Sequence, residues 1–186
     1  MSRWYLVVFL SALTQSLAAQ TVVRPEPALD AGRASLRDAL LQFRDTLSRI
    51  DAAASRLQRD YRQASPASLL SRARVMREAC ARSVRSLPAA RKAALAAAAT
   101  TELRLRRRDE LVGAMDQLQK HLALCESDFA AMSSPGEAER VRGYGNDRAR
   151  RALTATRQYE RVLGTFFNAM GIKVTPLGAR ARPVAG

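Results

Sequence analysis

The feature that most constrains the fold is an uninterrupted apolar repeat between Leu111 and Met132. Apolar side chains recur there at alternating intervals of four and three residues: Leu111, Met115, Leu118, Leu122, Cys125, Phe129 and Met132. This spacing places the side chains along one seam of an α-helix, and such a seam is buried only when other helices pack over it. We therefore expect an all-α protein in which this segment is one member of a bundle.

Three further segments carry the same kind of repeat. They run from Leu36 to Tyr61, from Leu69 to Leu87 and from Ala149 to Met170. Breaks rich in proline, serine and glycine separate them. We predict helices over residues 28–62, 66–99, 102–133 and 136–170. Four rods of similar length with short connections are typical of an antiparallel up-down-up-down four-helix bundle.

Pro88 leaves two layouts open, because a proline inside a helix either ends it or kinks it. If the chain turned at Pro88, Cys80 would lie about 12 Å and Cys125 about 54 Å from the turn, too far apart to bond. If the helix continues and the turn falls near Thr100, these distances become about 29 Å and 35 Å. We favour the second layout, which predicts one interhelical disulfide between the two cysteines of the chain.

The beginning of the last helix is also open. Ser134 and Glu137 have the spacing of a capping box, which favours a start near residue 136. Gly143 and Gly145 lie within three residues of each other and disfavour a helix there, which would move the start to about residue 147.

The N-terminus has the pattern of a secretory signal peptide over residues 1–19. Arg3 precedes the apolar run Trp4–Leu13, and small residues follow at Ser16 and Ala18. The run is shorter than the roughly 20 residues that cross a bilayer, so we expect no transmembrane segment in the mature chain. An exported protein, periplasmic or extracellular, favours a disulfide between its two cysteines.

The rest of the chain divides into three parts. Residues 20–27 form a linker, residues 28–170 the four-helix bundle domain, and residues 171–186 a basic, flexible tail. We expect the tail to lie at the end of the bundle where the last helix stops.

The net charge of +14 predicts attraction to anionic partners such as lipid head groups or acidic glycans. The densest basic cluster is Arg104–Arg108, and the favoured layout places the basic residues of the tail at the same end of the bundle. The candidate anion-binding residues are Arg104, Arg106, Arg107, Arg108, Lys173, Arg180 and Arg182. Aromatic side chains that would stack nucleic-acid bases are missing from the cluster, so we expect no specific nucleic acid. The plainer interpretation is a solvated bundle tip.

No catalytic constellation, metal-binding motif or cofactor motif stands out, so we expect neither an enzyme nor a metal site nor a cofactor. His121 is the single histidine, and with Met76, Met115 or Met170 it would be the basis of a b-type haem carrier. The long apolar seams and the alanine-rich stretch 89–99 would instead fit a self-associating structural coiled-coil protein. Our leading hypothesis is an exported, non-enzymatic binding protein of the cell envelope that contacts anionic components through its basic end.

Signal cleavage is the first testable prediction. Protein purified from an exporting host should lack residues 1–18 or 1–19, because the small residues before these bonds fit a signal peptidase. Intact mass spectrometry measures this directly. Purified protein that retains Met1 and the apolar run would contradict the predicted export signal.

Overall fold

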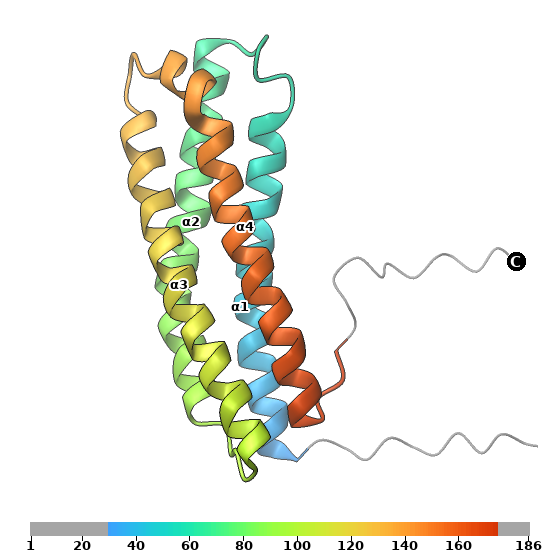
Figure 1. The fold of residues 1–186 in the computed structure, drawn as a ribbon. Coiled ribbons are helices and arrows are strands. Elements are labelled where there is room, and N and C mark those ends of the chain that lie inside the picture. Colours follow the sequence, from blue (N-terminus) through green and yellow to red (C-terminus); the bar gives the residue numbers. More distant parts are fainter. Residues whose placement is uncertain (1–29, 175–186) are drawn as a thin grey trace, which may run out of the picture.

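Four helices make up nearly all of residues 30–174, the part of the chain that the computed structural model describes. They are α1 (Ala31–Gln58), α2 (Pro66–Leu95), α3 (Glu102–Met132) and α4 (Ala138–Met170). Consecutive helices run in opposite directions and pack side by side (Figure 1). The predicted antiparallel up-down-up-down four-helix bundle is therefore confirmed. The predicted signal peptide and linker, and the tail beyond residue 174, lie outside the described residues.

The first three helices begin at side-chain caps. Asp30, Ser65 and Thr101 each accept a hydrogen bond from the backbone N–H three residues later, at 2.8, 3.3 and 3.3 Å. Each bond satisfies one of the N–H groups that a helix leaves unpaired at its start. At α2 the cap is followed by Pro66 in the first helical position, where proline loses no hydrogen bond.

The predicted capping box at the start of α4 is wrong. Glu137 occupies the N-cap position, and no side chain there bonds to the helix backbone. Ser134 instead accepts a hydrogen bond from the N–H of Glu137 through its backbone carbonyl, at 3.2 Å. Gly136 adopts a positive φ of 88°, which a glycine tolerates, and the resulting tight turn carries Ser134 out of the cap position.

Pro88 does not end its helix, and α2 continues beyond it to Leu95. The proline side chain lies on the exposed face of the helix. The carbonyl of Val84 loses its N–H partner there, and an outward-facing position allows water to replace that bond. The turn between α2 and α3 falls between residues 96 and 101, as the favoured layout predicted.

The bounds of two helices differ from the prediction, and those of a third settle its alternatives. The second helix ends at Leu95 rather than residue 99. The first helix ends at Gln58 rather than residue 62, and Asp60 follows in the left-handed region with a φ of 48°. The last helix begins at Ala138 and includes Gly143 and Gly145. A Cβ atom at Gly145 would lie 3.5 Å from Cδ2 of Leu57 on α1, an ordinary van der Waals contact, and 3.3 Å from Cγ1 of Val141 on its own helix, which is slightly tight.

The predicted seam of α3 forms one wall of the hydrophobic core. Its seven members are all buried, with exposed fractions of 3% or less. The largest buried side chains beside them are aromatic, and Phe43 meets Tyr159 edge to face at a centroid distance of 5.5 Å. The seam periodicity therefore identifies the buried face of α3 correctly.

The bundle is narrower along one diagonal. Cα atoms of α2 and α4 come within 8 Å of each other across the core, whereas those of α1 and α3 do not. The buried faces of α2 and α4 are rich in small residues, among them Ala73, Ala90, Ala149 and Ala152. Small side chains permit this approach, so the alanine content of α2 has a function inside the bundle.

A disulfide joins α2 to α3, as predicted. Cys80 and Cys125 are bonded with a Cα–Cα distance of 6.1 Å, and both are buried in the core. This bond is consistent with an exported protein. Within residues 30–174 no helix is long and apolar enough to cross a membrane.

Removal of the disulfide tests its contribution to stability. The bond closes a loop of 45 residues. The paired change Cys80→Ala and Cys125→Ala should lower the free energy of unfolding by about 4 kcal/mol, because the unfolded chain gains the entropy of an open loop. Urea denaturation measures the change, and reduced wild-type protein is the matched control. A loss below about 1 kcal/mol would contradict the role assigned to the bond.

Candidate anion-binding site at one end of the bundle

The predicted basic cluster lies at one end of the bundle. There α1 and α3 begin and α2 and α4 end, at the bottom of Figure 1. Arg104, Arg106, Arg107 and Arg108 lie in the first two turns of α3, and Lys173 follows α4 shortly after its C-terminus. The structure thus brings the N-terminal part of α3 and the C-terminal part of α4 to the same end. Arg180 and Arg182 fall outside the described residues.

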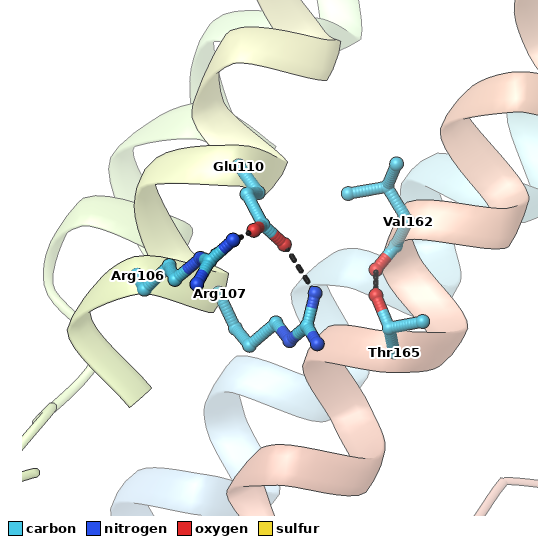
Figure 2. Close-up of polar contacts among 5 residues, drawn as sticks. All are labelled: Arg106, Arg107, Glu110, Val162 and Thr165. Atoms are coloured by element: carbon cyan, nitrogen blue, oxygen red, sulfur yellow. Dashed lines mark hydrogen bonds and ion pairs between the residues drawn. The ribbon is translucent and has the colours of Figure 1, made fainter. Parts of the chain in front are cut away.

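Two of the four arginines share one carboxylate. Arg106 donates through Nε to Glu110 at 3.1 Å, and Arg107 donates through Nη1 to the other carboxylate oxygen at 2.6 Å. Figure 2 shows Glu110 between them. The hydrogen bond from Arg107 holds the pKa of Glu110 below its ordinary value. One positive charge of this trio remains uncompensated, and the Arg106 side chain is 76% exposed.

The third arginine of the cluster has a partner of its own. Arg108 donates to the neighbouring Asp109 through Nε and Nη2, both at 3.2 Å. The pair is close to neutral as a unit. Arg108 therefore contributes less to an anion-binding surface than its position in the sequence indicates.

The fourth, Arg104, is held by neutral groups. Its Nε donates to the backbone carbonyl of Ala169 at 3.2 Å, and its Nη1 donates to Oγ1 of Thr100 at 3.4 Å. The carbonyl belongs to the last turn of α4, where unpaired carbonyls carry partial negative charge. These bonds orient the guanidinium without neutralising it, so Arg104 keeps its full charge in a defined place.

A cavity of about 520 Å³ lies beside Arg104. Leu36, Ala97 and Met170 form part of its apolar lining, and Arg33 and Arg104 contribute positive charge. Arg33 is paired with Asp30 at 2.9 Å, so Arg104 is the uncompensated cation of the lining. The combination of apolar lining residues and an oriented guanidinium suits a ligand with an acidic group and an apolar part.

The structure also shows a basic surface that the sequence reasoning missed. Helix α2 contains seven basic residues and one acidic residue, Glu78. Arg74, Arg77 and Arg85 are exposed, and none of them forms an ion pair with another described residue. Counting charges helix by helix, rather than seeking the densest run, would have found this face. Between α1 and α2 it borders a cavity of about 280 Å³ that Arg49, Arg56 and Arg82 line.

The haem alternative gains no support from the position of its residues. His121 is exposed on α3, beside a cavity of about 240 Å³. Met76, Met115 and Met170 are each at most 2% exposed and pack in the hydrophobic core. Over residues 30–174, no group of three or more His, Cys, Asp and Glu side chains is placed to hold a metal ion.

One buried polar group stands apart from the basic end. The Tyr159 side chain is 1% exposed, and its hydroxyl has no hydrogen-bond partner within the described part of the chain. Burial raises the pKa of this phenol above its ordinary value, so it is neutral at physiological pH.

Comparisons with protein-family models, with curated proteins and with solved structures found no match for this chain.

Replacement of the buried tyrosine tests whether its hydroxyl is unpaired. Tyr159→Phe should raise the free energy of unfolding by about 1 kcal/mol, because a buried hydroxyl without a partner is costly in the folded state. Urea denaturation measures the difference. The control Tyr61→Phe changes a partly exposed phenol and should shift stability by less than about 0.5 kcal/mol. A destabilised Tyr159→Phe protein would show that the hydroxyl has a partner.

Proposed function

We propose that this protein is an exported, non-enzymatic binding protein of the cell envelope. It contacts anionic components, either lipid head groups or acidic glycans, through the basic end of its bundle. Export is supported by the predicted signal peptide and by a disulfide of the kind that persists in oxidising compartments. The net charge of +14 draws the protein to anionic surfaces in general.

The observation that carries the proposal is the arrangement around Arg104. A guanidinium whose charge no carboxylate neutralises is fixed by Ala169 and Thr100 at the edge of a cavity of about 520 Å³. A fixed guanidinium loses little entropy when it binds a planar or tetrahedral anion, and it has donors suited to two parallel hydrogen bonds. Phosphate, sulfate and carboxylate groups all fit this chemistry.

The other cations at this end strengthen the attraction to an anionic ligand, but some of them are already paired with carboxylates. Glu110 and Asp109 compensate two of the three arginines in Arg106–Arg108. Lys92, near the end of α2, is exposed and forms no ion pair within residues 30–174. We therefore assign the principal contacts to Arg104, Arg106 and Lys92 and a lesser part to Arg107 and Arg108. Self-association and haem binding through His121 stay hypotheses that no particular observation favours.

Neutralising the basic end tests the proposal. The fourfold change of Arg104, Arg106, Arg107 and Arg108 to Gln should weaken binding at least tenfold, since each basic residue near an anionic surface contributes about 1 kcal/mol. Binding is measured by sedimentation with phosphatidylglycerol vesicles and by retention on a sulfated glycan. It should also weaken as salt rises.

The matched control removes the same charge from another face. The control changes Arg49, Arg74, Arg77 and Arg85 to Gln; all four are exposed and none forms an ion pair within the described chain. Its binding should fall by less than about threefold, because an exposed charge beyond a Debye length of the contact is largely screened. Equal losses in both variants would show that net charge alone drives binding and would overturn the assigned site.

A further inference from the structure

The basic end also carries exposed leucines. Six large apolar side chains are exposed in residues 30–174, and three of them lie at this end: Leu95, Leu103 and Leu105, with exposed fractions of 47, 57 and 40%. Leu95 is the last residue of α2, and the other two lie in the first turn of α3. A single exposed leucine is ordinary on a protein surface, but three at one tip of the bundle give that tip an apolar character.

Each exposed leucine at the tip is followed by a cation farther from the tip on the same helix. On α2, Leu95 is three residues closer to the tip than Lys92, and on α3, Leu103 and Leu105 are each three residues closer than Arg106 and Arg108. Three residues of helix correspond to about 4.5 Å. On both helices, therefore, each exposed leucine has a basic side chain about one helical turn behind it. Arg104 lies between Leu103 and Leu105, and its guanidinium donates to the carbonyl of Ala169 in the last turn of α4.

This order matches the boundary of a lipid bilayer. Interfacial protein segments bury apolar side chains about 5–10 Å into the boundary between head groups and acyl chains, and their basic side chains reach the phosphates above. An acidic glycan offers no apolar layer that would accept three leucines. We infer that the α2–α3 tip inserts Leu95, Leu103 and Leu105 into an anionic bilayer while Lys92 and Arg106 bind its phosphates. This inference rests on the proposed function and specifies its ligand.

Glu102 is an acidic group at the tip that opposes this docking, and unlike Asp30 at the start of α1 it has no basic partner within residues 30–174. It is the first residue of α3, and it is exposed. Its carboxylate lies at the depth of the leucines and would be repelled by lipid phosphates. Removal of this charge by Glu102→Gln should therefore strengthen binding to anionic vesicles, by about fivefold for one unit charge.

Replacement of the leucines is the decisive experiment. The triple change Leu95→Ser, Leu103→Ser and Leu105→Ser should lower binding to phosphatidylglycerol vesicles at least tenfold. The matched control is Val75→Ser with Leu124→Ser, which changes side chains that are 40% and 61% exposed on the flank of the bundle. The control should bind within twofold of wild type. Circular dichroism during thermal unfolding shows that every variant is folded.

A second readout reports insertion itself. A tryptophan introduced by Leu103→Trp should shift its emission to the blue when vesicles are added, because its ring leaves water. A tryptophan introduced by Leu124→Trp, which lies 21 residues along the same helix and so about 30 Å away, should not shift. In any form of the protein that retains Trp4, the change Trp4→Phe removes the background signal.

The outcomes separate this inference from the proposed function. Vesicle binding that depends on the arginines but not on the leucines would overturn insertion and leave anion binding in place. Binding to a sulfated glycan without binding to vesicles would also overturn the lipid assignment alone. No binding to either probe would overturn both.

Discussion

The alignment of α2 against α3 is the constraint on which the rest of the structure depends. The Cys80–Cys125 bond holds the two helices at a Cα–Cα distance of 6.1 Å in the middle of the core. This pairing is reached only because α2 continues through Pro88 and the chain turns after Leu95. The same turn places the end of α2 beside the start of α3, so Lys92, Leu95 and Arg106 lie at one tip. The register that pairs the two cysteines is therefore also the register that places these charged and apolar side chains at one surface.

The positive charge that the basic end offers to a ligand depends on which arginines form ion pairs, as well as on how many arginines there are. Four arginines in five residues look like a strong anion site, but Glu110 and Asp109 lie within reach and compensate part of their charge. The charge of Arg104 is not compensated in this way, because its partner on α4 is the backbone carbonyl of Ala169 and not a carboxylate. A helix end thus holds a cation in position through its unpaired carbonyls and leaves the charge available to a ligand.

The surface of the bundle has two basic regions with different properties. The outer face of α2 is more basic, yet its alanines and arginines lie along the flank of the rod. The tip carries fewer uncompensated charges but combines them with exposed leucines and a cavity. Charge alone gives long-range attraction, which salt screens, whereas apolar insertion is insensitive to salt. The tip has both components, and for that reason we assign the contact to it rather than to the flank.

The fold class and the buried faces of the helices could be predicted from the residues alone. The path through Pro88 is favoured over its alternative because only that layout lets the two cysteines bond. These predictions rest on the local periodicity of apolar residues and on the constant rise per residue of an α-helix. Both are properties of a single segment and do not depend on the helices that pack against it. The close approach of α2 to α4, the partners of the four arginines and the exposure of Leu95, Leu103 and Leu105 could not be predicted before the helices were packed together. Ion pairs and exposure depend on how far each neighbouring helix extends and which side chains it presents. The capping box failed for a related reason, because a positive φ at Gly136 changed the turn in a way that residue spacing does not record.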